Sequence, residues 1–453
     1  MKYKRLGLIV AFCFVSWLVL ALVIFSDNLT KKSDVETRKG SLLKYIQELE
    51  LQISQQEETY KLLVDKLKNL TPGHENVVQA MELKHISDYE PKTSFLTIKQ
   101  DVLQEKSVIL PVLVFSCNRP DIRRSLDGLL QYRPDAKKFP IIVSQDCAHG
   151  ATAKVIRSYS DASQVTYIQQ PDQSEPIVPH GEAKFKGYFK IARHYLFGLK
   201  QIFRTFNYTA VIIVEDDLDV APDFFSYFAS TYQLLKNDPT LWCVSAWNDN
   251  GKASLVDVQH GSELLYRSDF FPGLGWMITK QLWDELEPKW PKSYWDDWMR
   301  RPEQRKDRAC IRPEISRTRT FGKIGVSNGM FFDKHLKYIK LNEMPVDFSM
   351  QNLSHMVQTA YDADYIRHVY SLPVVSASDV RTNTNLPFDG PVRITYHTKD
   401  TFKNAAKFLG LMDDFKSGVP RTGYHGIVSV FLNGRRVYLA PHSNWKGYDL
   451  TWS

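Results

Sequence analysis

A run of β-branched residues, Val211–Val214, leads directly into three consecutive acids, Glu215, Asp216 and Asp217. This pattern predicts a buried parallel strand that stops where the acids begin. Ligands of open α/β sheets bind beyond the carboxyl ends of the strands, where adjacent carboxylates repel unless a cation neutralises them. Hard ions such as Mg2+ or Mn2+ take oxygen ligands and bind substrate phosphates. We therefore expect an α/β fold with a metal-bound diphosphate site; a solvated acidic turn is the competing interpretation.

Strands and helices are expected to alternate through this part of the chain. Strands are predicted at residues 108–115, 139–143, 165–169 and 211–214, and helices at 123–132 and 187–206. The first two strands are followed by Arg119 and Asp146, so each ends in polar residues as the acidic strand does. Alternation favours a mostly parallel sheet with helices on both faces. No GxGxxG or GxxxxGKS/T pattern follows a strand, which argues against dinucleotide and P-loop sites.

Length and net charge limit the number of structural units and the kinds of partner that we expect. A chain of 453 residues is too long for one simple core and fits two or three structural units. A net charge of +7 is mild for this length, and no basic stripe with interleaved aromatic residues occurs. We therefore expect no nucleic-acid partner.

The amino terminus resembles a membrane anchor. Residues 6–25 carry no charge, and the basic residues before them lie within 2–5. That length spans a bilayer, and the positive flank stays cytoplasmic. We predict a cytoplasmic tail at 1–5, a signal-anchor at 6–25, and a luminal remainder. A cleaved signal peptide is the alternative, but its apolar core would be shorter and no clear cleavage site follows Phe25.

The segment between the anchor and the globular region, residues 26–105, is predicted to be a stem. Apolar residues within 41–68 recur at alternating spacings of four and three, which is a heptad pattern. A short parallel coiled coil that forms a homodimer is one interpretation. A single solvated helix with a weak apolar stripe is the other.

Cysteine usage agrees with an oxidising compartment. Cys13 lies in the predicted span, which leaves Cys117, Cys147, Cys243 and Cys310 as an even luminal set. Two disulfides are therefore expected, with three possible pairings. No CxxC pair occurs, so a zinc site is not expected.

Two later segments carry further structural signals. Residues 241–332 are rich in Trp and Gly. Aromatic faces suit sugar rings as well as cores, and we expect most of these rings in the core. Asn433-Gly434 separates two apolar runs, which predicts a hairpin within a small β-containing appendage at the C-terminus.

A collinear series of distinctive segments runs through the globular region. They are VSQDC (143–147), KIARHY (190–195), VEDDLDVAPDFF (214–225), LWCVSAWNDNG (241–251), DFFPGLGW (269–276), EPKWPKSYWDDWMRRPEQR (287–305), CIRPEISRTRTFG (310–322) and KSGVPRTGYHGIV (416–428). On these segments the chain, from about Val112 to Tyr448, resembles one family of Golgi enzymes, the N-acetylglucosaminyltransferase I family. Short motifs match by chance, but a long series in the same order does not.

The resemblance implies a GT-A fold, with the catalytic domain at 106–335 and a C-terminal portion, 336–453, that completes it. It implies inverting transfer of N-acetylglucosamine from UDP-N-acetylglucosamine. The acceptor would be the 2-hydroxyl of the alpha-1,3-arm mannose of a high-mannose N-glycan. The cofactor would be Mn2+, and the location the Golgi membrane with a luminal catalytic domain.

The resemblance also implies roles for individual residues. Asp217 would ligate Mn2+, and Asp216 would contact the nucleotide sugar. The other donor-site positions are Arg119, Asp146, His194 and Ser327. One departure is Asn118, where the family pattern leads us to expect Asp beside Arg119; it puts fine nucleotide contacts in doubt, not the reaction.

The family's catalytic base falls on Asp296, and Asp297 beside it is the rival. Inversion requires a base on the acceptor face, whereas a metal-bound diphosphate leaves without a general acid. The family's disulfides fall on Cys117–Cys147 and Cys243–Cys310.

Other functions remain open on the sequence. A related enzyme adds N-acetylglucosamine to O-mannose on proteins, but it is expected to carry an extra luminal carbohydrate-binding domain, and this stem is short. A glycoside hydrolase with two carboxylates would need neither metal nor nucleotide. A non-catalytic luminal lectin or scaffold could share the fold.

Overall fold

The computed structural model describes residues 108–453, apart from 327–328, 330, 385, 387–388 and 453. The predicted tail, anchor and stem lie outside the described residues. Within the described part, no helix has the length and apolar character needed to cross a membrane.

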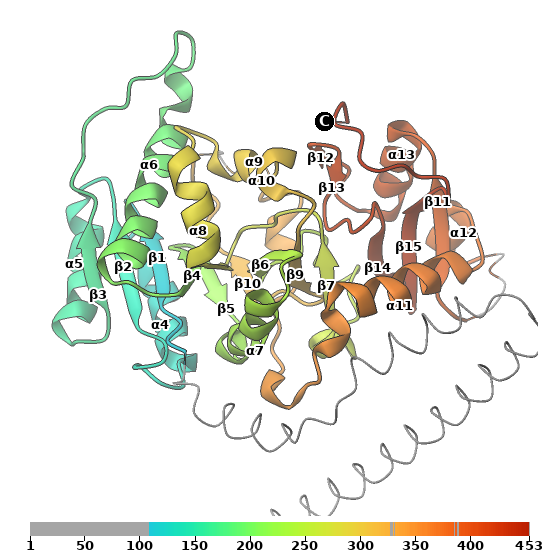
Figure 1. The fold of residues 1–453 in the computed structure, drawn as a ribbon, viewed down its shortest axis with the longest axis horizontal. Coiled ribbons are helices and arrows are strands. Elements are labelled where there is room, and N and C mark those ends of the chain that lie inside the picture. The colour runs from blue at the N-terminus through green and yellow to red at the C-terminus, as the bar shows by residue number, and fades with distance from the viewer. Residues whose placement is uncertain (1–107, 327–328, 330, 385, 387–388, 453) are drawn as a thin grey trace, which may run out of the picture. The chain divides into compact units, whose positions relative to one another are not determined.

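The central sheet has eight strands in the order β3-β2-β1-β4-β8-β6-β9-β7 (Figure 1). Strand β8 runs antiparallel to β4 and β6, β7 runs antiparallel to β9, and the remaining neighbours are parallel. The sheet is therefore mixed and mostly parallel. The strand bounds are β1 Val112–Ser116, β2 Ile141–Gln145, β3 Thr166–Gln169, β4 Ala210–Glu215, β6 Leu241–Ser245, β7 Leu265–Ser268, β8 Trp276–Thr279 and β9 Ala309–Pro313.

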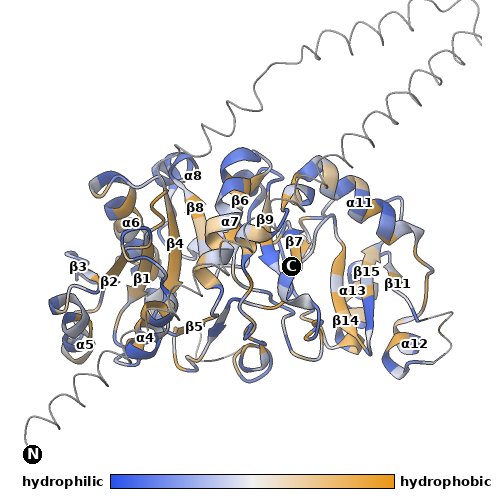
Figure 2. Ribbon diagram, turned by 90° about the horizontal axis from the view of Figure 1, so that it is seen from below, coloured by the Kyte–Doolittle hydropathy of each residue, from blue (hydrophilic) through white to orange (hydrophobic). Residues whose placement is uncertain are grey.

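Side chains of alternate strand residues pack into two separate cores, one on each face of the sheet. In β1, Val112 and Val114 join one core, whereas Leu113 and Phe115 join the other. This is the period of two expected of a strand that is buried on both faces. Figure 2 shows β4 and β8 as largely apolar.

Helices cover both faces, as the alternating pattern predicts. The first core takes α4 (Ile122–Tyr132), α5 (Gly150–Asp161) and α7 (Phe224–Asn237). The second takes α6 (Lys186–Lys200), α8 (Lys280–Leu286) and α9 (Trp295–Met299), and the short α10 (Pro302–Arg305) follows α9. The helix predicted at 187–206 is α6 followed by a π-helical turn, Gln201–Thr205.

A second, smaller sheet forms the C-terminal region. It has three strands, β11 (Val392–Tyr396), β14 (Val428–Leu432) and β15 (Arg435–Pro441). The helices of this region are α11 (Gln358–Ser371), α12 (Ala377–Thr382) and α13 (Lys399–Leu409). The predicted hairpin is confirmed: β14 and β15 pair antiparallel, and both Asn433 and Gly434 have positive φ, as a type I′ turn requires.

Two short ribbons complete the described strands. Strands β5 (Leu218–Val220) and β10 (Thr318–Thr320) pair antiparallel just beyond the acidic triplet. Strands β12 (Phe415–Lys416) and β13 (Val419–Pro420) form the second ribbon. The first ribbon matters for the site because it brings the chain after Thr320 back to Asp217.

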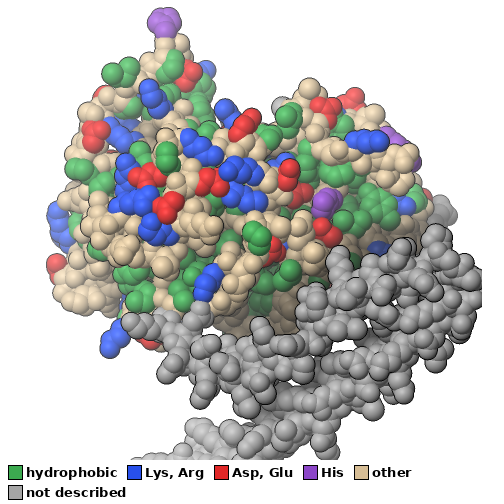
Figure 3. All heavy atoms as spheres, in the orientation of Figure 1, with side chains coloured by type: hydrophobic (Ala, Val, Ile, Leu, Met, Phe, Trp, Pro, Cys, Tyr) green, Lys and Arg blue, Asp and Glu red, His purple; other side chains and the backbone are tan. Residues whose placement is uncertain are grey.

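The Trp-rich segment is mostly core, as predicted. Its largest fully buried side chains are Trp242, Trp247, Trp276 and Trp283. Charged side chains of both signs are intermixed on the face shown in Figure 3. Exposed pairs of this kind contribute little stability individually.

Candidate active site

The sheet order places the predicted donor-site residues together, at the carboxyl ends of neighbouring strands. Strands β2, β1 and β4 are neighbours and parallel, so their carboxyl ends meet there. Arg119 follows β1, Asp146 follows β2, and the acidic triplet ends β4. Residues far apart in sequence are thus brought together where ligands of α/β sheets bind.

Asp216 is held by the end of β1. Its carboxylate accepts hydrogen bonds from the Ser116 hydroxyl (2.9 Å), the Cys117 backbone N–H (3.2 Å) and Arg119 Nε (3.1 Å). Burial nevertheless raises the pKa of Asp216 above its ordinary value, and attraction to Arg119 offsets only part of this effect. The donors fix the orientation of this side chain from three directions.

Asp217 has the environment of a cation ligand. Loss of contact with water, opposed by Arg119 and reinforced by the charge of Asp216, raises the pKa of Asp217 to about 6. Its closest cation is Arg119 Nη2, at 3.4 Å. A Cβ atom at Gly322 would overlap the Asp217 carboxylate, so only glycine leaves room for it there. A desolvated, crowded carboxylate beside another acid gains from a bound divalent cation.

The described residues offer few side-chain ligands for a metal ion at this site. Within the described residues, no group of three or more His, Cys, Asp or Glu side chains gathers as a metal cage. One carboxylate suits an ion such as Mg2+ or Mn2+, which keeps water and takes oxygens from substrate phosphates. The residues present therefore fit a metal–diphosphate complex.

Glu215 connects the acidic triplet to the second core, on the face of the sheet that α6, α8 and α9 cover. Its carboxylate accepts a hydrogen bond from the Tyr195 hydroxyl (2.7 Å). The Tyr195 ring stacks between Phe115 (4.0 Å between centroids) and Trp295 (4.2 Å). Desolvation, and next the charge of Asp217, raise the pKa of Glu215 to about 7. This chain of contacts links β4 to α9.

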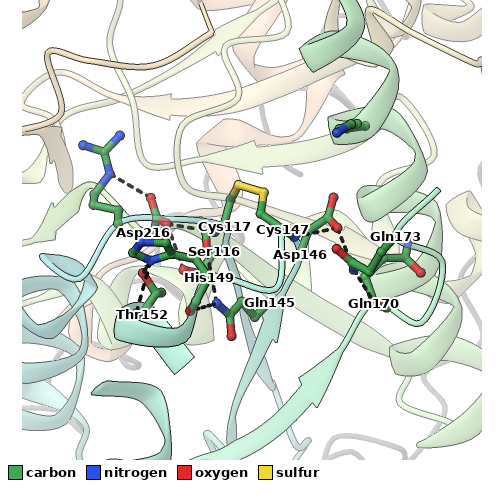
Figure 4. The surroundings of a disulfide bond; sticks show 12 residues. Ser116, Cys117, Gln145, Asp146, Cys147, His149, Thr152, Gln170, Gln173 and Asp216 are labelled. Carbon is green, nitrogen blue, oxygen red and sulfur yellow. Dashed lines mark hydrogen bonds and ion pairs between the residues drawn. A yellow bond between two sulfur atoms is a disulfide. The ribbon is translucent and has the colours of Figure 1, made fainter. Parts of the chain in front are cut away.

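Asp146 lies on the other side of the Cys117–Cys147 disulfide from Asp216 (Figure 4). Asp146 Oδ1 accepts hydrogen bonds from the Cys147 N–H (2.8 Å) and from Gln173 Nε2 (3.1 Å). The side chain is therefore fixed at the end of β2 and is almost fully buried.

His194 belongs to the same edge but lies beneath the surface. Its Nε2 atom is 2.8 Å from the Ser144 hydroxyl, and its ring meets Phe115 edge-on. Burial lowers the pKa of His194 to about 4, although the charge of Asp146 acts in the opposite direction. The imidazole is therefore neutral at physiological pH.

The two acids of α9 differ in their partners. Arg300 Nη1 binds both Asp296 (2.8 Å) and Asp297 (2.9 Å), while Lys416 Nζ of β12 binds Asp297 alone (3.1 Å). Burial alone would raise the pKa of Asp297, but the charges of Arg300 and Lys416 outweigh it and hold this pKa below its ordinary value. Asp296 lies close enough to the triplet to raise the pKa of Glu215.

Ser327 lies outside the described residues. The segment before it lies against the site: the Phe321 N–H donates to the Asp217 carbonyl (2.9 Å), and Arg119 Nη2 donates to the Ile324 carbonyl (2.9 Å). The Val326 side chain packs so closely against Gly187 of α6 that a Cβ there would meet it.

Both disulfides have the pairing that the resemblance implies. Cys117–Cys147 joins the ends of β1 and β2, with Cα atoms 5.2 Å apart. Cys243–Cys310 joins β6 to β9, where the two residues are register partners. The first disulfide therefore ties together the loops that carry Arg119 and Asp146.

Sequence reasoning missed several residues of the site. Tyr195 stands inside the matching segment KIARHY, but only the structure reveals its bond to Glu215. Gly322 ends another matching segment, and a glycine beside the predicted metal ligand was the signal that could have identified it. Ser116 and Gln173 carried no signal, because their partners are distant in sequence.

Comparison with known proteins decides the family. The sequence profile of the GNT-I family matches residues 9–452. The chain belongs to the GNT-I family. A relative, alpha-1,3-mannosyl-glycoprotein 2-beta-N-acetylglucosaminyltransferase of Arabidopsis thaliana, is 42% identical over 335 residues, which is 73% of this chain and 73% of the relative.

Two solved structures show more distant likeness. The mannosyltransferase PcManGT from Pyrobaculum calidifontis, in complex with GDP-Man and Mn2+, has 15% identity and a TM-score of 0.25, covering 40% of this chain and 47% of that one. S. aureus TarS 1–349 in complex with UDP-GlcNAc has 12% identity and a TM-score of 0.32, covering 66% and 72%. Membership of the GNT-I family rests on the sequence matches alone.

Proposed function

We propose that this GNT-I family member transfers N-acetylglucosamine from UDP-N-acetylglucosamine to the 2-hydroxyl of the alpha-1,3-arm mannose of high-mannose N-glycans, on a GT-A catalytic domain. The transfer would open the route to hybrid and complex N-glycans. The observation that carries the proposal is that Tyr195 joins the half-buried acidic triplet to α9: its hydroxyl binds Glu215, and its ring stacks on Trp295, the residue before Asp296. A donor site and a base facing it are the two parts that an inverting transferase needs.

The donor would lie along the carboxyl edge of β2, β1 and β4. Arg119 offers a guanidinium for phosphate, and Asp216 is already oriented by three hydrogen bonds. Asp146 and the neutral imidazole of His194 would contact the nucleotide from the β2 side. Ser327 is proposed as the remaining donor contact, on the basis of the family resemblance alone.

Asp217 is proposed as the protein ligand of Mn2+. Its support is the desolvated carboxylate, the neighbouring charge of Asp216 and the space left by Gly322. A bound divalent ion would neutralise the charge that develops on the UDP leaving group. The remaining chemistry falls to the protein: Asp216 and Arg119 orient the donor, and a base acts on the acceptor.

Asp296 is proposed as that base. The acceptor hydroxyl oxygen attacks the anomeric carbon from the face opposite UDP, the bond between that carbon and UDP breaks, and the carboxylate takes the hydroxyl proton. Attack from the opposite face inverts the configuration. Asp297 is the weaker candidate because two cations, Arg300 and Lys416, hold its carboxylate, whereas Asp296 has Arg300 alone as its ion-pair partner among the described residues. A weak base suffices when proton transfer is late in the reaction.

The experiment supplies UDP-N-acetylglucosamine and a five-mannose N-glycan to the purified protein, with Mn2+ and then with excess chelator. Metal-dependent addition of one N-acetylglucosamine is the expected result. No transfer by a folded protein that binds UDP would contradict the proposal, and O-mannosyl peptide would be tested next. No UDP binding would favour a lectin or scaffold, and donor-independent glycan cleavage would favour a hydrolase.

The protein is further proposed to be a single-pass Golgi membrane protein with its catalytic domain in the lumen. The apolar segment at 6–25 and the two disulfides support this location. In sealed Golgi vesicles, the catalytic domain should resist added protease until detergent is present. Crosslinking of the intact chain would test whether residues 41–68 form a homodimer.

A further inference from the structure

Three aromatic side chains form a cluster at the start of α9, the helix that carries the predicted base. Tyr188 and Tyr294 stack with ring centroids 4.6 Å apart and planes at 27°. Phe185 meets Tyr294 at 6.2 Å and Tyr188 at 6.3 Å. All three side chains are half-buried, so their rings keep contact with solvent. Two segments distant in sequence, the start of α6 and the turn before α9, therefore meet through an accessible aromatic surface.

Tyr294 has a backbone conformation that is rare for a bulky residue. Its φ of 48° and ψ of 49° lie in the left-handed region, which is costly for a side chain with a large ring. Such outliers persist where the surrounding structure enforces them, and they concentrate at ligand-binding sites. Tyr294 immediately precedes α9, and its carbonyl accepts a hydrogen bond from the Trp298 N–H (2.9 Å).

The chain fixes the position of this cluster relative to the reacting groups. Trp295, the next residue, turns inward and stacks on Tyr195, whose hydroxyl binds Glu215. Asp296 follows Trp295. Tyr294 is therefore half-buried beside the buried Trp295, two residues before the base.

The cluster has the chemistry of a sugar-binding surface. A pyranose ring presents C–H groups on one face, which pack on aromatic rings, and hydroxyls at its edge, which need hydrogen-bond partners. The Tyr188 and Tyr294 hydroxyls have no hydrogen-bond partner among the residues that the structure describes. They are therefore free to bind the hydroxyls of a sugar that stacks on the rings.

We propose that Tyr188 and Tyr294, with Phe185 beside them, bind the pyranose ring of the acceptor mannose. This inference rests on the proposed function, because it assumes that Asp296 is the base. The base must face the acceptor hydroxyl. The donor groups stand at the ends of β1, β2 and β4, and the stack of Trp295 on Tyr195 joins them to α9. An accessible aromatic surface at the start of the helix that carries the base is where the acceptor ring belongs.

The test measures both Michaelis constants with the full chain in detergent. The wild-type protein is assayed first, and absence of transfer to the five-mannose glycan would refute the proposed function itself. Given wild-type activity, Tyr294→Ala and Tyr188→Ala should each raise the acceptor KM roughly tenfold, the loss expected for one stacking contact. The donor KM and UDP affinity should stay unchanged. Tyr294→Phe, which keeps the ring, should retain most acceptor binding.

Phe206→Ala is the matched control. Phe206 is an exposed ring that pairs with Tyr208 at 6.2 Å, beyond the other end of α6. Its removal should leave the acceptor KM unchanged. An unchanged acceptor KM in both tyrosine variants, or a rise in the donor KM instead, would overturn the proposal.

A measurement on the wild-type protein covers the case in which Tyr294→Ala fails to fold. Nuclear magnetic resonance saturation of the aromatic protons, in the presence of UDP, should transfer to ring protons of the bound five-mannose glycan, and Tyr188→Ala should weaken that transfer. Equal saturation transfer in Tyr188→Ala and wild type would overturn the proposal that the aromatic cluster binds the acceptor.

Discussion

At the scale of single residues, the three acids of the triplet have three different environments. Glu215 is bound by a tyrosine hydroxyl, Asp216 by donors from the end of β1, and Asp217 lies against Gly322. One sequence motif therefore supplies a structural link, the proposed donor contact and the proposed metal ligand. The local sequence predicts that the acids end a strand, but their separate partners come from distant segments.

Asp217→Ala should abolish metal-dependent donor binding while the fold persists. The substitution removes the proposed metal ligand and also relieves charge repulsion with Asp216, so stability should not fall. Calorimetry with UDP-N-acetylglucosamine and Mn2+ measures the first effect, and thermal unfolding measures the second. We expect turnover to fall by roughly 100-fold or more, as when a preorganised electrostatic contact is lost. If Asp217→Ala turns over in Mn2+ at the wild-type rate, Asp217 is not the metal ligand.

Gly322→Ala tests the close approach of the chain to Asp217. The added Cβ would overlap the carboxylate, so the side chain or the segment must shift. A displacement of about 1 Å in such a site can cost about 100-fold in rate, and we expect a loss of roughly 10- to 100-fold. Gly325→Ala is the control, because a Cβ there meets nothing within 4 Å. Equal activities of the two variants would contradict the account.

At the scale of elements, the Cys117–Cys147 disulfide and the strand order together position the residues of the proposed donor site. The disulfide joins the β1 and β2 ends that carry Arg119 and Asp146. The cysteines could be assigned to an oxidising compartment from sequence, but residue spacing alone left three pairings open. The distance between Cα atoms, and with it the role of the disulfide in the site, comes from the fold.

Replacing Cys117 and Cys147 with Ser should lower the free energy of unfolding by about 2–5 kcal/mol. It should also weaken UDP binding, because the two donor-site loops are no longer tied. The Cys243→Ser and Cys310→Ser pair provides the control, since that disulfide joins β6 to β9. It should cost similar stability and leave the UDP affinity of the folded protein unchanged. Urea unfolding and UDP titration measure the two effects, and equal UDP affinities in both double variants would refute the positioning role.

Strands and helices were largely predictable because their signals are local. The β-branched run before Glu215 predicted β4, and Asn433-Gly434 predicted the β14–β15 hairpin. The reversed direction of β8 and β7 was not predictable, since the choice of strand partners depends on the whole chain. The π-helical turn after α6 likewise carries no local signal.

At the scale of the molecule, stability should depend on the protonation of His194. The folded pKa of about 4 lies below the ordinary value because burial disfavours the charged ring. The unfolded chain therefore binds a proton at His194 that the folded protein does not, and this group by itself lowers stability as pH decreases from about 6.5 towards 4. The raised pKa values of Glu215 and Asp217 act in the opposite direction over the same range, so the test compares two proteins. Urea unfolding at several pH values should show that His194→Gln loses less stability than the wild type as pH falls through this window, and identical pH profiles would contradict the assignment.

The site as a whole was predicted further by family resemblance than by local pattern. The sequence pattern alone predicted a strand that ends in acids and a divalent ion bound to them, and it left a solvated acidic turn as the alternative interpretation. Asp296 came from the resemblance, and the structure adds the cation partners that separate it from Asp297. The aromatic cluster of Phe185, Tyr188 and Tyr294 could not be predicted, because it joins two segments only in the folded molecule.

The most direct test of the account compares Asp296→Asn with Asp297→Asn. For each variant, UDP binding in Mn2+ and the rate of transfer to a five-mannose glycan would be measured. We predict that Asp296→Asn keeps UDP affinity and loses turnover by roughly 100-fold or more, because the base is removed from an intact donor site. Asp297→Asn should retain most activity. An active Asp296→Asn beside a dead Asp297→Asn would show that the base is the other acid of α9 and that the cation partners were misread.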